Sequence, residues 1–415
     1  MQTLTTLDDL DAKLQECHAA GQVSDDALRE VFRTFQMDFS GELPADPFDP
    51  TYAAAQMGIY ERISGRRYAL ANEATPFDLE QAGRRPFPYN TGSCGTAGQH
   101  LSAIGFLLRT MQLAPGGRVL EFGPGWGNTT LALAQLGFDV TAVDVEPRFC
   151  ELIRRRAALV GATVTAINSD FFWAESARER FDAVVFFECF HHCADHGRLL
   201  RALHGVLAES GRLYFGAEPI VDDYPVPWGV RMDGESLWAI RSNGWLELGF
   251  RTDYFRQALH RAGWAARKHV SDFVGGTVWE AWRRDAGPFR VPAADPRLHT
   301  VTGVKDAGGI RLRGGATGYG LFGPYVPLGP GRYLGRVLFA ADAPRAGRFV
   351  LDVAAQNGQQ VLASVAHDAA AIPPGDGAAA VEFALDAWED AVELRVLCDG
   401  DVCGLITGIE IVECN

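Results

Sequence analysis

The sequence contains no long hydrophobic run. None of its apolar stretches approaches the roughly 20 residues that a helix needs to cross a bilayer. Its first residues also lack the basic stretch followed by an apolar stretch that marks a secretory signal. We therefore expect no transmembrane segment and a cytoplasmic location.

Paired cysteines are also missing. The eight cysteines are scattered, with no Cys-x-x-Cys pair and no paired Cys/His spacing of a zinc site. This pattern predicts reduced thiols and no bound metal. An alternative is a disulfide between Cys398 and Cys403, which flank a predicted turn at Asp399 and Gly400, but it would need an oxidising compartment.

Positive charge is scarce. Lys and Arg total 38 against 52 Asp and Glu, which gives a net charge of −14. Such a surface repels phosphate backbones and anionic lipid, so nucleic-acid binding is disfavoured. Hydrophobic residues make up 47% and charged residues 22% of the chain, which excludes bulk disorder.

The 415 residues divide into three regions with different sequence patterns, and the sequence shows no internal repeat. Residues 1–100 combine helical leucine spacing with a Pro-rich aromatic stretch, which predicts a helical arm. Residues 101–288 alternate apolar strands with helices, which predicts a doubly wound parallel sheet of the Rossmann-like α/β class. Residues 289–415 read as short alternating strands, which predicts an all-β, jelly-roll-like sandwich.

The strongest motif is a glycine turn between a predicted strand and a predicted helix. Gly123, Gly125 and Gly127 follow a strand that carries Glu121. Glycines let the backbone approach a ligand that a Cβ would exclude, at the strand end where α/β sheets bind ligands. Asp144 ends the second strand, at the distance expected of a carboxylate that grips a ribose diol.

Two ligands fit a glycine turn of this kind. A dinucleotide fingerprint needs a third glycine at the position of Asn128, where this chain has none. The pattern from Glu121 to Gly127 instead resembles motif I of the class I S-adenosylmethionine-dependent methyltransferases. Asp144 and Asp170, at the ends of the next two strands, fit the same family in the right order.

The resemblance covers about residues 100–285 and implies S-adenosyl-L-methionine as cofactor. It implies that the glycine loop surrounds the methionine portion and that Glu121 meets its ammonium group. It further implies that Asp144 binds the ribose hydroxyls and that Asp170 contacts adenine. The segment Arg85-Pro-Phe-Pro-Tyr-Asn-Thr-Gly92 is similar to one that precedes motif I in bacterial methyltransferases encoded among glycosyltransferases, so Tyr89 is expected to cover the donor or contact substrate.

The segment after the fourth predicted strand concentrates ionisable groups. Glu188, His191, His192 and His196 lie there, in a chain with only 10 histidines. This strand end borders the cleft in a doubly wound sheet, and an alcohol acceptor must lose a proton when it is methylated. We predict His192 as the base, Glu188 as its orienting or acceptor-binding partner, and His191 as the next candidate.

An insertion after the fifth predicted strand is expected to form a lid over the cleft. It begins Glu218-Pro-Ile-Val-Asp-Asp-Tyr-Pro-Val-Pro-Trp228 and continues to Trp238, Arg241 and Trp245. Aromatic faces beside carboxylates suit a sugar. Asp222 and Asp223, with Glu188 or a histidine, are an alternative site for a hard divalent ion, although nothing in the spacing demands one.

The last part of the chain contains a segment that indicates the class of substrate. Gly318–Tyr333 resembles the opening of β-sandwich domains appended to bacterial glycosyltransferases, and Tyr319, Phe322 and Tyr325 either stack on sugar or fill the core. We predict O-methylation of a sugar hydroxyl on a nucleotide sugar or surface glycan. The alternatives are a small-molecule or peptide O- or N-methyltransferase, and an inactive core that binds glycan as a scaffold. The tail also allows a homodimer.

Overall fold

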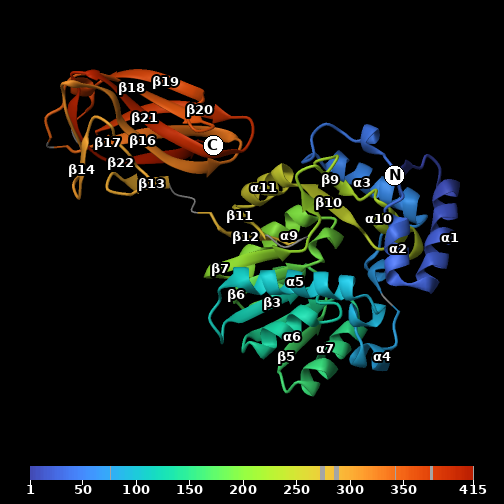
Figure 1. Cartoon of the computed structure of the whole chain (residues 1–415). Coiled ribbons are helices and arrows are strands. Elements are labelled where there is room, and N and C mark those ends of the chain that lie inside the picture. The colour runs from blue at the N-terminus through green and yellow to red at the C-terminus, as the bar shows by residue number, and fades with distance from the viewer. Residues whose placement is uncertain (75, 272–275, 285–288, 342, 374–376, 415) are drawn as a thin grey trace. The chain divides into compact units, whose positions relative to one another are not determined.

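The computed structural model describes residues 1–74, 76–271, 276–284, 289–341, 343–373 and 377–414. The chain forms two compact units, Met1–Arg284 and Asp285–Asn415 (Figure 1). The boundary predicted at residue 288 lies outside the described residues. Among the helices that the structure describes, none is long and apolar enough to cross a membrane.

A seven-stranded sheet is the centre of the first unit, with the order β11-β12-β7-β6-β3-β4-β5. The five strands β3 to β7 run parallel, whereas β12 is antiparallel to both of its neighbours. The prediction of a Rossmann-like α/β domain is confirmed. The strands are β3 (Arg118–Phe122), β4 (Asp139–Asp144), β5 (Val164–Asn168), β6 (Phe181–Phe187), β7 (Leu207–Gly216), β11 (Trp264–Val270) and β12 (Thr277–Arg283).

Helices cover both faces of this sheet because its strands are apolar on both sides. In β6, Ala183 and Val185 share one buried cluster with Leu107 of α5, while Val184 and Phe186 share another with helices α9 and α11. The helices are α5 (Cys94–Met111), α6 (Asn128–Gln135), α7 (Pro147–Leu159), α8 (Trp173–Ser176), α9 (His196–Ala202) and α11 (Thr252–Arg261), with 3-10 turns η4 (Phe190–His192) and η5 (Leu203–Gly205).

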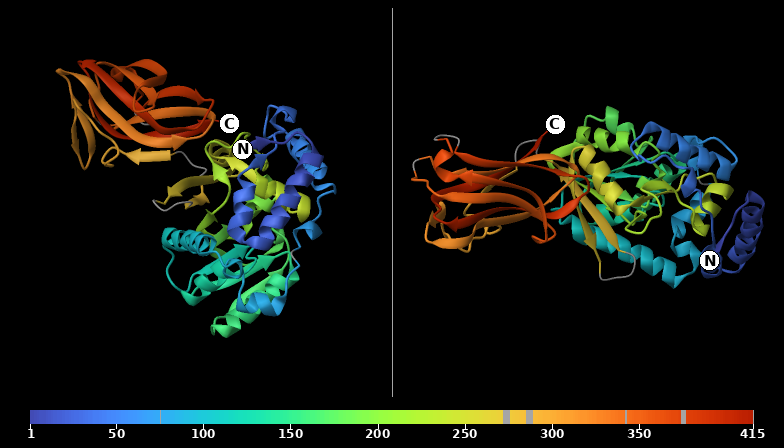
Figure 2. Two further views of the ribbon diagram at one scale, coloured as in Figure 1. Left: turned by 45° about the vertical axis from the view of Figure 1, so that its right-hand side comes forward. Right: turned by 90° about the horizontal axis from the view of Figure 1, so that it is seen from above.

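The N-terminal helices pack against the insertion between β7 and α11 (Figure 2). Tyr52 and Gln56 both donate hydrogen bonds to the carbonyl of Trp228, at 2.8 and 3.0 Å. Arg241 forms a bidentate ion pair with Asp11, at 2.9 Å for each bond. The arm and the insertion therefore form one layer, which we call the cap.

The cap is made of short elements. Ser24 caps the second helix by accepting from the N–H of Ala27. The arm contains β1 (Gln2–Thr3), α1 (Leu7–Val23), α2 (Asp25–Phe32), β2 (Phe35–Gln36), η1 (Ser40–Glu42), α3 (Pro50–Ser64), η2 (Leu70–Glu73), α4 (Leu79–Arg84) and η3 (Tyr89–Thr91), of which α4 packs on α7 and η3 on α5. The insertion contributes β8 (Ile220–Val221), β9 (Trp228–Val230), α10 (Gly234–Ser242) and β10 (Leu248–Arg251).

The second unit is built from two antiparallel sheets that share one hydrophobic core, which contains Val337, Leu351, Val396 and Ile409. One sheet has the order β14-β15-β22-β17-β20, with β13 beside β22, and the other has the order β16-β21-β18-β19. A jelly-roll strand order stays a prediction. The elements are β13 (Phe289–Pro292), β14 (Val304–Asp306), β15 (Gly309–Arg313), β16 (Ala316–Leu328), β17 (Gly331–Phe339), β18 (Arg348–Ala355), β19 (Gln360–Asp368), η6 (Ala369–Ala371), β20 (Ala378–Leu385), β21 (Glu389–Gly400) and β22 (Cys403–Cys414).

All eight cysteines are free thiols, and Cys398 is buried while Cys403 is half-buried.

Candidate active site

The glycine turn connects β3 to α6 at the carboxyl end of the sheet. Gly123, Gly125 and Gly127 have φ values of 57°, 50° and 76°, which side chains rarely adopt. A Cβ on Gly123 would lie 2.6 Å from the Cβ of Cys189, and one on Gly127 would lie 2.7 Å from Ile153. A Cβ on Gly125 would meet no atom within 4 Å. The outer glycines therefore allow close packing, and the middle one faces open space.

Replacing Gly127 with alanine is expected to destabilise the first unit by about 2–4 kcal/mol, from the left-handed backbone and the clash with Ile153 together. Chemical denaturation followed by tryptophan fluorescence measures this loss. Gly98→Ala is the control, because that exposed glycine of α5 has no neighbour within 4 Å and alanine favours a helix. Equal midpoints for Gly127→Ala and the wild type would contradict the packing argument.

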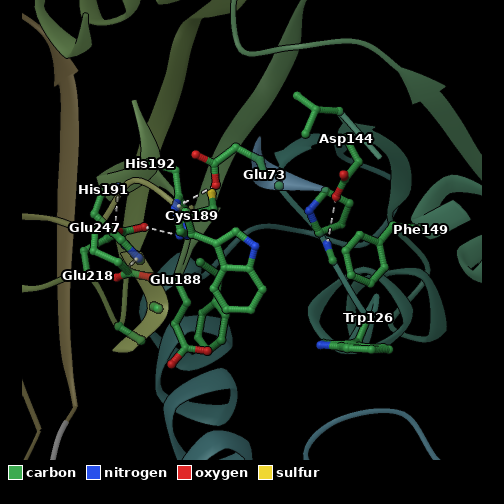
Figure 3. A pocket seen from close by; sticks show the side chains of 18 of the residues that line it. Glu73, Trp126, Asp144, Phe149, Glu188, Cys189, His191, His192, Glu218 and Glu247 are labelled. Atoms are coloured by element: carbon green, nitrogen blue, oxygen red, sulfur yellow. Dashed lines mark hydrogen bonds and ion pairs between the residues drawn. The ribbon is translucent and has the colours of Figure 1, made fainter. Parts of the chain in front are cut away.

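A pocket of about 580 Å³ opens beside this turn, and Figure 3 shows its two sides. Trp126, Asp144 and Phe149 lie on the glycine side, with Gly123, Gly125 and Asp170 also in the lining. The histidine side holds His191, His192, Glu218 and Glu247. The sheet topology brings most of these groups together because parallel strands place their carboxyl ends at one edge, and Glu247 is added by the insertion before β10.

The acid predicted to bind a ribose is held by the glycine loop itself. The Asp144 carboxylate accepts the N–H of Gly125 at 3.1 Å and the N–H of Glu146 at 2.8 Å. Burial raises the pKa of this carboxyl to about 6, despite those hydrogen bonds. Asp170 lines the same side and accepts the N–H of Phe172 at 2.9 Å. Both acids thus face the pocket as their strand positions predicted.

Two other residues predicted to bind the donor lie outside the pocket lining. Glu121 is only 1% exposed and accepts a hydrogen bond from the Thr130 hydroxyl at 2.5 Å. Burial raises the pKa of Glu121 to about 7. Tyr89 is 41% exposed, and its carbonyl accepts from Arg85 at 2.7 Å. Neither residue is among those that line the pocket, so their roles stay predictions.

The 3-10 turn η4 presents the histidines, and Glu218 holds that turn in place. One oxygen of Glu218 accepts the N–H groups of Cys189 and Phe190, both at 2.9 Å. The other accepts the N–H of His191 at 3.2 Å and lies 2.8 Å from the His191 Nδ1. Burial raises the pKa of Glu218, but His191 and the backbone donors outweigh it, so the net pKa is lowered.

Each histidine also faces a second acid. Nε2 of His191 lies 3.5 Å from Glu247, whose other neighbour is Arg231 at 3.6 Å. Nδ1 of His192 lies 3.4 Å from Glu73. Among the described residues, that buried nitrogen has no hydrogen-bond partner.

Burial shifts the pKa values of the histidines and of Glu73 in opposite directions. Burial is the largest cause that lowers the pKa of His192, to about 3, and the neighbouring His191 lowers it further. Burial also raises the pKa of Glu73 to about 8. For His191, burial lowers the pKa, but Glu218 and Glu247 raise it by more. His192 is therefore held neutral at physiological pH, which makes it a weak proton acceptor and an available lone-pair donor.

The other predicted site residues, after β6 and in the insertion, have different surroundings. Glu188 lines the pocket with a half-exposed side chain, at 3.3 Å from Nδ1 of His100. His196 is buried against Tyr254, with Nε2 at 2.7 Å from the hydroxyl, and is not part of the lining. Asp222 and Asp223 are exposed, outside the lining, and Asp222 pairs with Lys268 at 3.0 Å.

Sequence reasoning missed Glu73, Glu247 and Arg231, which the cap supplies to the pocket. Glu73 belongs to η2 of the arm, and its carboxylate accepts the N–H of Leu246 at 3.0 Å. No local pattern around these residues signalled a site. In the insertion predicted to form a lid, Trp238 and Trp245 both line the pocket.

The strand order, the glycine turn and the acids at the ends of β4 and β5 define the architecture of a class I methyltransferase domain. Residues 120–215 match the family model described as a methyltransferase domain. The chain therefore carries an S-adenosylmethionine-dependent methyltransferase domain, with S-adenosyl-L-methionine as its cofactor.

Known proteins are similar to parts of the chain at low identity. The chain is 25% identical over 173 residues to a ubiquinone biosynthesis O-methyltransferase of Xanthomonas axonopodis pv. citri (strain 306), covering 41% of this chain and 62% of that protein. It is 31% identical over 153 residues to a protein-L-isoaspartate O-methyltransferase of Methylorubrum extorquens (strain PA1), covering 36% and 59%. A magnesium protoporphyrin IX methyltransferase from Synechocystis PCC 6803 with bound SAM matches with a TM-score of 0.33 and 17% identity, over 54% of this chain and 89% of that one.

The predicted ribose contact of Asp144 implies that donor affinity rises with pH, because the carboxyl would have to ionise to accept two hydroxyls. With a pKa of about 6, the ionised fraction grows about tenfold between pH 5 and pH 7, and the affinity for S-adenosylhomocysteine should follow it. Calorimetric titration at several pH values measures the change. Asp144→Asn should bind more weakly and without this dependence, whereas an unchanged wild-type affinity across the range would contradict the role of Asp144.

Proposed function

We propose that the protein transfers the methyl group of S-adenosylmethionine to a hydroxyl of a sugar. One observation carries the proposal: a single pocket joins the donor-side residues Gly125, Asp144 and Asp170 to a buried cluster of histidines and carboxylates. In the reaction, the oxygen–carbon bond forms as the sulfur–carbon bond breaks, and the hydroxyl proton leaves. Much of the rate then comes from alignment and exclusion of water.

The choice of oxygen as acceptor rests on the histidine side. Hydroxyl groups donate hydrogen bonds to carboxylates and to neutral imidazoles, and this side offers Glu73, Glu247 and His192. The similar proteins from Xanthomonas and Methylorubrum are both named O-methyltransferases, which agrees with an oxygen acceptor.

The choice of a sugar rests on the cap. Trp238 and Trp245 line the pocket together with Glu73, Glu235 and Glu247. Indole faces pack against the C–H groups of a pyranose, and carboxylates accept its hydroxyls. An uncharged glycan is also indifferent to the net charge of −14, whereas the phosphates of a nucleotide sugar would be repelled by it.

The second unit has a role in the same proposal, as a module that holds a glycan. On β16, Phe322 stacks on His299 with ring centroids 5.3 Å apart, and Tyr325 is 37% exposed next to them. Exposed aromatic rings of this kind suit a saccharide chain. A nucleotide sugar and a growing surface glycan both remain within the proposed substrate class.

Transfer of a labelled methyl group tests the proposal. Full-length protein is incubated with donor carrying a deuterated methyl group and with separate pools of nucleotide sugars, oligosaccharides, phenols and peptides, and mass spectrometry identifies the product. We expect the label on a sugar oxygen. Label on a phenol or a peptide would overturn the sugar assignment, and failure to bind S-adenosylmethionine would overturn methyl transfer itself.

A further inference from the structure

Three side chains of the histidine side have the arrangement of a metal-binding site. His191, His192 and Glu247 each offer one ligand atom, and these atoms all lie within 4.8 Å of one another. Two of the side chains come from η4, and the third comes from the cap just before β10. Imidazole nitrogens and a carboxylate are the ligand types that catalytic zinc sites use, usually three of them with one position open.

The surroundings of His191 orient its ring as a metal ligand. Nδ1 lies 2.8 Å from the Glu218 carboxylate, which also accepts three backbone N–H groups and so is fixed in place. With its proton on Nδ1, the ring directs the lone pair of Nε2 toward Glu247, at 3.5 Å. A carboxylate behind a ligating histidine is the usual outer partner of a metal-bound imidazole.

Nε2 of His191 and the Glu247 carboxylate, 3.5 Å apart, both carry lone pairs and repel each other unless a proton or a metal ion lies between them. A proton on His191 is one possibility, and a metal ion is the other. His192 adds a second observation, because its buried Nδ1 has no hydrogen-bond partner among the described residues. A third ligand atom, the second imidazole nitrogen of the group, lies within 4.8 Å of the other two and favours a metal ion over a proton.

The charge around the cluster points the same way. Glu188, Glu218, Glu235 and Glu247 all line the pocket, where Arg231 is the one Lys or Arg among the described lining residues and Arg29 pairs with Glu235 at 3.7 Å. Arg231 is itself shared with Asp233, at 3.0 Å. A divalent cation would offset this excess of carboxylates in a poorly solvated site.

We propose that His191, His192 and Glu247 bind one divalent transition-metal ion, with Zn²⁺ as the first candidate, and that its open position takes the acceptor oxygen. The ion would lower the pKa of that hydroxyl, whose proton leaves to water before the oxygen attacks the methyl carbon. This role rests on the proposed function, but the binding of the ion does not.

Metal binding is tested directly on full-length protein without a histidine tag. The protein is stripped with a chelator, loaded with Zn²⁺ and gel-filtered, and the bound metal is measured by mass spectrometry, with the affinity determined by competition against a chromophoric chelator. We expect one Zn²⁺ per chain and, with Co²⁺ instead, the visible absorption of a tetrahedral complex. Glu247→Gln and His192→Asn should each weaken binding by about 100-fold.

The double variant Asp222→Asn, Asp223→Asn is the matched control, because both residues are exposed and outside the pocket. It should bind Zn²⁺ like the wild type, and a loss there would overturn the location. Wild-type protein that binds S-adenosylhomocysteine but not Zn²⁺ or Co²⁺ would overturn the metal site and leave the proposed function standing. S-adenosylhomocysteine binding by each variant also verifies that it is folded.

Discussion

Replacement of Glu218 by alanine is expected to destabilise the first unit by about 4 kcal/mol and to abolish methyl transfer. The side chain is completely buried and accepts from the N–H groups of Cys189, Phe190 and His191, with His191 Nδ1 also at 2.8 Å. Its removal leaves these buried donors without their carboxylate acceptor, and unpaired buried partners of this kind cost about 3–5 kcal/mol.

Denaturation followed by tryptophan fluorescence measures this loss, because eight of the nine tryptophans precede residue 285 and report on the first unit. Glu80→Ala is the matched control, since Glu80 and Arg84 form an exposed i,i+4 pair that contributes about 0.5 kcal/mol or less. If Glu218→Ala were as stable as Glu80→Ala, the Glu218 carboxylate could not be what holds η4 and its histidines in place.

The second large effect is expected for His192→Ala, which should reduce kcat by about 100-fold or more while the affinity for S-adenosylhomocysteine changes little. His192 lies on the side of the pocket opposite Asp144, so its loss removes acceptor activation and spares donor binding (Figure 3). A loss of this size is expected for a metal ligand, whereas an imidazole with so low a pKa would contribute less as a proton acceptor.

The acceptor found in the labelling experiment provides the assay for His192→Ala. His18→Ala is the control, because His18 is an exposed residue of α1. Wild-type turnover by His192→Ala at every pH, with donor binding intact, would exclude His192 from the reaction. The pKa of His192, lowered to about 3 by burial and His191, predicts that this residue adds no pH dependence to kcat between pH 5 and pH 9.

The donor side was predictable because its signals are local in the sequence. A glycine turn between β3 and α6, and an acid at the end of each following strand, follow from topology alone, and Asp144 and Asp170 line the pocket accordingly. Glu121 shows the limit of such reasoning. The residue is next to the turn in sequence, but its side chain points to Thr130 rather than into the pocket.

The acceptor side was predictable only in part. The concentration of ionisable residues after β6 indicated His191 and His192. Their partners, Glu247 and Glu73, come from distant segments of the cap. Glu73 belongs to the arm and Glu247 to the insertion, and no periodicity or spacing connects either one to η4. Tertiary packing of two irregular segments decides this geometry, so short-range sequence patterns could not reveal it.

The two antiparallel sheets of the second unit followed from alternation. Within this alternating region, residues 310–313, 333–339, 349–353 and 392–397 all lie in strands. The exposure of individual aromatic residues did not follow, because Tyr319 and Phe322 are half-buried while Tyr325 is exposed on the same strand. Which side chains of a sheet stay exposed to solvent depends on the segments that pack against that sheet.

Calorimetric titration of S-adenosylhomocysteine into the full-length protein at pH 7.5 or above, where Asp144 is ionised, tests the central claim most directly. The glycine turn, Asp144 and Asp170 predict saturable binding of one molecule per chain, weakened about 100-fold or more in Asp144→Ala. No saturable heat from the wild type, or equal affinity in Asp144→Ala, would contradict the assignment of this pocket to a methyl donor.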